Sequence, residues 1–179
     1  MANMCFNSLN ISGPKEDVQR FLSAVKTNES QFDFNGAVPM PDELKNAQSP
    51  NANPDSQEAQ NLIEKYGADN WYSWAIANWG TKWNPSCIDD WDIDDSGNEM
   101  NINLCFETPW SPPTEFLLNA SKVYSTLSFW NEFYEQGSEN IGEHIIANGE
   151  WTRRNEPEWD SKEGIALRQD FGIYDIEEE

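Results

Sequence analysis

The chain has 179 residues with 32 acidic and 11 basic side chains, so its formal net charge is −21. This charge excludes direct binding to nucleic acid or to an anionic membrane surface, and any electrostatic partner should be basic. Aromatic residues make up 13% of the chain, which excludes a disordered acidic polymer because such chains are poor in aromatics.

Three cysteines without a CxxC pair fit a reducing compartment. The first residues lack the charged and apolar segments of a signal peptide, and no apolar run approaches the roughly 20 residues of a transmembrane helix. The sequence therefore predicts a soluble cytoplasmic protein.

The first forty residues predict a β-α-β pattern. Residues 5–11 alternate between apolar and polar side chains, which is typical of a strand. Residues 14–27 repeat apolar side chains at helical spacing. Phe32 and Phe34 then alternate and predict a brief second strand.

A polar segment rich in Pro, Asn and Ser follows from residue 39 to about 56 and predicts an irregular loop. Two helical segments come next, one ending at Gly67 and the other at Gly80, since glycine commonly terminates a helix. We therefore expect a helical insertion at about 37–85.

Residues 87–107 predict a β-hairpin, because two alternating runs flank the turn sequence Ser96-Gly97-Asn98. On the first run we expect Cys87, Trp91 and Ile93 to point inward and the carboxylates to point outward. The hairpin would thus carry an acidic outer face.

A helix over 112–124, a strand over 127–133 and a hairpin partner over 141–146 are predicted next. The fold class is α+β, a ferredoxin-like split βαβ with an antiparallel sheet, helices on one face and a helical insertion between the halves. This domain is expected to cover residues 1–150, and residues 151–179 are expected to form an acidic C-terminal extension.

Four sequence motifs resemble the Api92-like family, which includes YubB-like proteins of phages, plasmids and genomic islands. They are Met1–Asn7, Phe34-Asn35 to Pro39-Met40-Pro41, Asn78–Trp83 and Phe106–Pro113. The resemblance covers roughly residues 1–150, with Met4 where the family usually has Trp and with a heavier acidic load. It implies a ferredoxin-like domain and a mobile-element origin, and it implies no activity.

Residues 92–103 partly match a calcium-binding loop, which places acids at positions 1, 3 and 5, Gly at 6 and Glu at 12. Asp92 and Asp94 fit the start, but positions 8 and 12 are Glu99 and Asn103. The segment also lies on a predicted hairpin without helical flanks. We expect no bound metal.

The only histidine, His144, lies in a predicted strand, where a lone histidine is usually a surface residue or a satisfied core residue. The sequence has no GxxxxGK[ST] or GxGxxG phosphate-binding loop. We therefore expect no catalytic residues, no cofactor and no enzymatic activity.

Negative charge is concentrated in the second half of the chain. Residues 86–179 hold 22 acids and 5 bases, whereas residues 1–85 hold 10 acids and 6 bases. Asp90, Asp92 and Asp94 are expected about 7 Å apart on one strand face. A duplex DNA segment of roughly 36 Å carries a charge similar to that of the whole protein.

These features predict an acidic inhibitor from a phage or other mobile element. It would bind a basic, nucleic-acid-handling protein of the bacterial host, such as a CRISPR or restriction nuclease complex, by nucleic-acid mimicry or steric blocking. The predicted partner-binding residues form two rows: Asp89, Asp90, Asp92, Asp94 and Asp95 on the first hairpin, and Glu132, Glu135, Glu139 and Glu143 on the later one.

An alternative is a regulatory or interaction module that uses an aromatic surface instead of charge. Salt separates the two, because a charge-led complex weakens as ionic strength rises. In either case we expect a monomer or small homo-oligomer.

Overall fold

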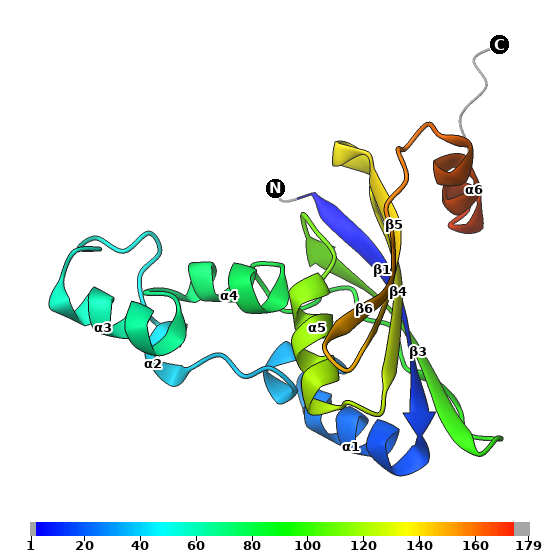
Figure 1. Cartoon of the computed structure of the whole chain (residues 1–179), viewed down its shortest axis with the longest axis horizontal. Coiled ribbons are helices and arrows are strands. Elements are labelled where there is room, and N and C mark those ends of the chain that lie inside the picture. Colours follow the sequence, from blue (N-terminus) through cyan, green and yellow to red (C-terminus); the bar gives the residue numbers. More distant parts are fainter. Residues whose placement is uncertain (1–2, 174–179) are drawn as a thin grey trace.

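The computed structural model describes residues 3–173 and centres on an antiparallel sheet (Figure 1). Within these residues the sheet has six strands in the order β2-β3-β1-β4-β5-β6. The strands are β1 (Met4–Pro14), β2 (Asp92–Asp94), β3 (Glu99–Pro109), β4 (Ser128–Glu135), β5 (Asn140–Ala147) and β6 (Glu150–Asn155). The predicted α+β fold is confirmed.

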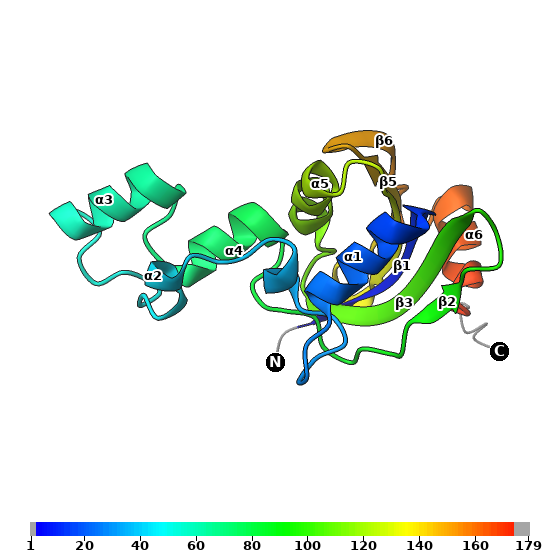
Figure 2. The ribbon, with the colours of Figure 1, turned by 90° about the horizontal axis from the view of Figure 1, so that it is seen from below.

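Two helices, α1 (Lys15–Val25) and α5 (Thr114–Val123), cover one face of this sheet (Figure 2). The helical spacing predicted for α1 is confirmed, because Val18, Phe21, Leu22 and Val25 are all buried. Alternate residues of β1 and β3 point toward the helices, among them Leu9 and Phe106. The hydrophobic core lies between this face of the sheet and the two helices.

Phe32 and Phe34 are fully buried, but they do not form the predicted strand. Phe34 begins a short 3₁₀ helix, η1 (Phe34–Gly36), because the Asp33 carboxylate accepts a hydrogen bond from the Asn35 amide and closes a turn. Both neighbouring positions beside β1 are occupied by β3 and β4. The alternation of the two phenylalanines instead places both rings in the core, where each contacts Phe116.

Helices α2 (Asp42–Lys45), α3 (Gln57–Tyr66) and α4 (Trp71–Trp79) form an arm that extends away from the sheet in both views (Figures 1 and 2). Gly67 and Gly80 end α3 and α4 in left-handed conformations, with φ of 75° and 77°. Both helix ends were predicted from the sequence. The arm joins the rest of the fold chiefly where α4 packs on α5.

The predicted hairpin at 87–107 is shorter than expected, because only Asp92–Asp94 of its first run pairs as a strand. Trp91 points inward as predicted, is buried and donates its indole N–H to the Gln31 carbonyl. Cys87 is exposed and does not point inward. Ile93 is opposite the buried Ile102 and so lies on the inward face as predicted, but it is 46% exposed because β2 is a three-residue edge strand.

After residue 150 the chain adds β6 to the sheet, and α6 (Lys162–Asp170) lies on the face opposite α1 and α5 (Figure 2). Phe171, directly after α6, contacts Phe6 and Tyr134 on that opposite face. The acidic end Glu177–Glu179 lies outside the described residues. None of the helices within residues 3–173 has the length and apolar character needed to cross a membrane.

Candidate functional site

The sheet face opposite α1 and α5, here called the open face, carries polar side chains from all six strands. Strand register places Asp92 opposite Asn103, Asn103 opposite Asn10, and Asn10 opposite Trp130. Directly opposed residues share a face of the sheet, so these side chains form a row across it. The Asn10 amide donates to the Asn103 side-chain oxygen at 2.8 Å, which fixes the middle of the row.

A second row on the open face contains Glu132 of β4 and Glu143 of β5, which are directly opposed. Burial raises the pKa of Glu132 above its ordinary value, and the negative charges of Glu143 and Asp170 raise it further. Glu143 is nearly buried and lies 2.9 Å from the Arg153 guanidinium. This row is therefore partly covered and partly neutralised.

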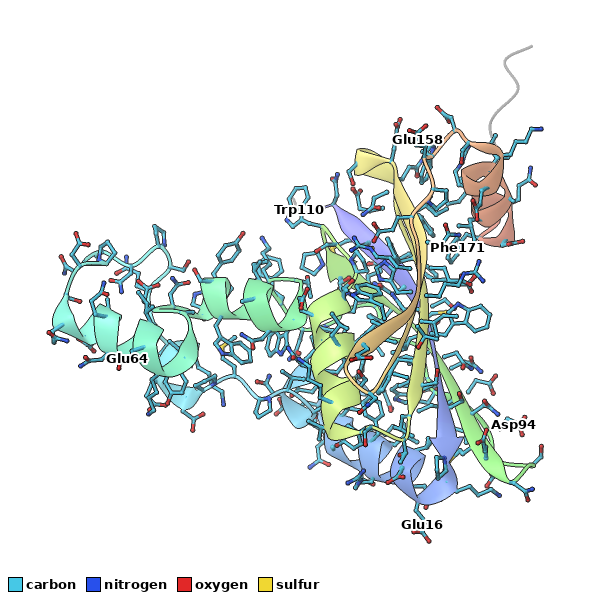
Figure 3. The ribbon with its side chains drawn as sticks, in the orientation of Figure 1. Glu16, Glu64, Asp94, Trp110, Glu158 and Phe171 are labelled. Carbon is cyan, nitrogen blue, oxygen red and sulfur yellow. The ribbon has the colours of Figure 1, made fainter. Side chains whose placement is uncertain are left out.

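The five aspartates Asp89, Asp90, Asp92, Asp94 and Asp95 are all exposed. None of them takes part in the ion pairs found within residues 3–173. Figure 3 shows Asp94 at the outer end of the sheet, far from the arm that carries Glu64. The run is thus an exposed and largely uncompensated block of negative charge.

Local hydrogen bonds shape the turn that follows β2. The Asp94 carboxylate accepts from the Ser96 hydroxyl at 2.7 Å and from its backbone N–H at 3.0 Å, and these bonds lower the pKa of Asp94. The Lys15 ammonium donates a hydrogen bond to the Asp95 backbone carbonyl at 2.6 Å. Within the described residues, no group of three or more His, Cys, Asp or Glu side chains is placed to hold a metal ion.

Glu135 and Glu139 lie at the tip of the β4–β5 hairpin, and only one of them is accessible. Glu135 is 2% exposed, and its carboxylate accepts bonds from the amides of Gly137 and Ser138 and from the Ser138 hydroxyl. Burial alone would raise the pKa of Glu135, but these bonds outweigh it and hold the pKa below its ordinary value. The carboxylate is used within the fold and does not belong to the surface. Glu139 is exposed.

The structure also places on the open face residues that the sequence analysis did not single out. Trp130 is 41% exposed and follows Asn10 in the first row. Alternation along each strand indicates which side chains share a face, but the order of the strands decides which of them are neighbours. That order depends on pairings between distant segments, so the row of Asp92, Asn103, Asn10 and Trp130 could not be assembled from local patterns.

Comparisons with known proteins support the ferredoxin-like fold and show similarity to one family. Residues 90–177 match the family model described as "Ferredoxin-like domain in Api92-like protein". A crystal structure of the protein api92 from Yersinia pseudotuberculosis is similar, with a TM-score of 0.51 and 10% sequence identity. The similarity covers 90% of this chain and 99% of that one. No match was found among curated proteins.

Proposed function

We propose a function from the surface of the molecule, because the family model that residues 90–177 match describes a fold and no activity. The protein acts as an acidic inhibitor that binds a basic, nucleic-acid-handling protein. Its contact surface is the aspartate run at 89–95 together with the adjoining open face of the sheet. Binding of this kind requires no chemistry by the inhibitor.

The observation that supports this proposal most strongly is the exposure of the aspartate run. Five carboxylates follow one another over seven residues, and none forms an ion pair within residues 3–173. Unpaired like charges repel each other and lower stability. A basic partner would remove that repulsion, and complementary charge would also accelerate the encounter.

The open face extends the acidic surface from β2 toward β4. These strands are three sheet positions apart, which corresponds to about 14 Å. Between them lie Asn103 and Asn10, whose side-chain amides can accept hydrogen bonds from arginine or lysine. Glu132 and Glu143 contribute less than the aspartate run, because burial and Arg153 reduce their charge or their access.

The partner class follows from charge and from the mobile-element setting that the family resemblance implies. A protein that handles nucleic acid presents a basic surface spaced to meet phosphates, and carboxylates can occupy that surface in their place. Defence nuclease complexes of the CRISPR or restriction type present such a surface, and a mobile element would benefit from inhibiting them. The bacterial cytoplasm would then be the place of action.

A second candidate is an interaction module that uses the helical arm. Ile63, Tyr72 and Ile76 of α3 and α4 are each more than 40% exposed, and Trp83 beyond the arm is 50% exposed. Exposed aromatic and aliphatic side chains are typical of protein–protein contacts. This candidate predicts a complex that is insensitive to salt and to the aspartates.

The test is capture from a host lysate on the immobilised protein, followed by competition with duplex DNA. We expect captured proteins to be nucleic-acid-binding, and to be released both by duplex DNA and by high salt. The protein alone should give no gel shift with the same DNA, because its net charge of −21 repels a polyanion. Capture that resists DNA and salt would favour the arm, and a gel shift by the protein alone would contradict mimicry.

A further inference from the structure

His144 lies on the sheet face that α5 covers, away from the acidic surface, and only 1% of it is exposed. It is directly opposite Asn131 of β4 and Arg154 of β6. Its ring contacts Phe133 at 4.6 Å and meets Trp151 edge-on at 4.7 Å. The imidazole is therefore held in one orientation by aromatic neighbours.

Both imidazole nitrogens have hydrogen-bond partners. His144 Nε2 lies 2.7 Å from Glu156 Oε1, and Nδ1 lies 3.2 Å from Thr114 Oγ1. A carboxylate only accepts, so Nε2 carries the proton and Nδ1 is left to accept from the Thr114 hydroxyl. Arg154 donates to both oxygens of Glu156 at 3.1 and 2.9 Å and fixes that carboxylate in turn.

This hydrogen-bonded chain opens into a cavity of about 400 Å³ between α4, α5, β5 and β6. Its lining is mixed, because Ile76 and Trp151 supply apolar surface whereas Glu115, Arg154 and Glu156 are charged. The volume is in the range of small-molecule sites. Gly80 also borders the cavity, and a side chain there would lie 3.1 Å from the Glu115 amide nitrogen.

Thr114 is the first residue of α5, and the preceding Pro113 supplies no side-chain cap. The first amides of a helix lack intrahelical acceptors and carry partial positive charge. The first amides of α5 therefore lie next to the Thr114 hydroxyl, which is already hydrogen-bonded to the His144 imidazole. A nucleophile, a base in hydrogen-bond reach and a third group that orients the base are the recurring arrangement of covalent catalysis.

We propose that Thr114, His144 and Glu156 form an acyl-transfer site that hydrolyses small carboxylic esters. Thr114 Oγ attacks the ester carbon, and its proton passes to His144 Nδ1. The bond to the alcohol breaks, and the alcohol leaves with the proton from Nδ1, so that an acyl ester of Thr114 remains. Water then attacks this ester and gives its proton to Nδ1, and the released Thr114 oxygen takes the proton back as the acid departs.

The electrostatic surroundings favour this role for His144. Burial lowers its pKa below the ordinary value, and the nearby Arg154 charge acts in the same direction. Glu156 opposes this effect by its hydrogen bond and its charge. On the other elements packed around His144, α5 contributes Glu115 at the border of the cavity, and β4 contributes Asn131, which is uncharged. A neutral imidazole at neutral pH is the form that can accept the Thr114 proton.

The site is independent of the proposed binding role, because it lies on the other face of the sheet. In the sequence, His144 is only a lone histidine in a predicted strand. The residues that complete the chain, Thr114 and Glu156, stand at 30 and 12 residues from it, and only the fold brings them together.

The experiment uses the whole protein with p-nitrophenyl acetate, a small activated ester. Thr114→Val removes the hydroxyl at similar size, Thr114→Ser keeps a hydroxyl, and Thr126→Val removes an exposed hydroxyl that bonds Asp17 elsewhere. We expect Thr114→Val to lower the hydrolysis rate about 100-fold and Thr114→Ser to recover part of that loss, whereas Thr126→Val should hydrolyse the ester as the wild type does. A fluorophosphonate probe should attach to the wild-type peptide that contains Thr114, as located by mass spectrometry.

Glu156 acts as a positioning residue. Its substitution should shift the pH–rate profile, an effect that a loss of packing alone would not produce. Glu156→Gln should move the limb of the pH–rate profile that reports His144 to lower pH, because the group that favours the imidazolium is lost. The proposal is overturned if wild type and Thr114→Val hydrolyse the ester equally, or if the probe attaches to another residue. If Thr114→Val fails to fold, probe mapping on wild type and Thr114→Ser gives the same decision.

Discussion

Glu132 and Glu143 stand directly opposite each other on β4 and β5, with both side chains on the open face. Burial, Glu143 and Asp170 raise the pKa of Glu132, so the folded protein binds this proton at higher pH than the unfolded chain does. The fold therefore loses stability as pH rises above about 4.3, the ordinary pKa of glutamate. Like charges in direct opposition on a sheet are destabilising.

We expect Glu132→Gln to increase the free energy of unfolding at neutral pH by about 0.5 kcal/mol, a value reduced for solvent screening. The gain should vanish in acid, where Glu132 is protonated in both states. Urea denaturation at several pH values measures both effects. Glu139→Gln, at an exposed hairpin tip, should change little. A loss of stability in Glu132→Gln at neutral pH would show that the carboxylate is used within the fold.

Removing charge from the aspartate run should slow binding of the captured partner. Asp90, Asp92 and Asp94 changed together to Asn keep their size and lose three charges. We expect the association rate to fall about tenfold at low salt and the dissociation rate to change less, because charge acts mainly by steering. Surface plasmon resonance measures the two rates separately.

The matched control removes the same charge from exposed sites away from the open face. Glu29→Gln, Asp55→Asn and Glu64→Gln lie after α1 and on or beside the arm. This variant should bind almost as the parent does. Equal losses in both triple variants would mean that net charge decides binding, and no loss in either would leave the aspartates as solvated surface only.

The single histidine of the chain makes its titration directly observable by NMR. Burial lowers the pKa of His144, so we expect its imidazole to titrate below about 6.5, the ordinary value. Glu156→Gln should lower the pKa further, because the carboxylate favours the protonated ring and Arg154 does not. The proton at neutral pH should reside on Nε2. A titration at or above the ordinary value would contradict the buried, neutral imidazole.

Gly36 lies where η1 approaches the end of α1. A Cβ at this position would collide with the backbone carbonyl of Ala24. Gly36→Ala should therefore lower the free energy of unfolding by about 1–3 kcal/mol, the usual cost of overpacking. Gly97→Ala, whose new Cβ would have its nearest neighbour at 3.6 Å, is the control and should change the melting temperature little. Equal melting temperatures for the two variants would contradict this close approach.

The elements that could be predicted from the sequence are those with regular periodicity. The stripe of α1 buries the side chains that its spacing indicates, and Gly67 and Gly80 end helices where glycine was expected to. Alternation also identified β3 and its inward face. In these segments the local pattern and the tertiary environment agree.

Local patterns failed where tertiary contacts decide the structure. Phe32 and Phe34 alternate as in a strand, but the backbone at Phe34 forms a turn and both rings are buried in the hydrophobic core. Ile93 alternates with aspartates, yet no element covers the edge strand on which it lies. β6 was not predicted because all but one of its side chains are exposed, so its sequence lacks the apolar face by which strands are recognised.

The pairing of β1 also constrains how the protein folds during synthesis. β1 lies inside the sheet, where Met4 pairs with Pro109 and Ser12 pairs with Ser128. More than half of the chain must therefore be synthesised before β1 can pair with β3 or β4. The α2–α4 arm is synthesised during this interval, when β1 has no paired strand. Contacts between such distant segments slow folding, although closing a loop twice as long costs only about 0.6 kcal/mol more. The arm thus delays assembly of the sheet mainly through the time taken to translate it.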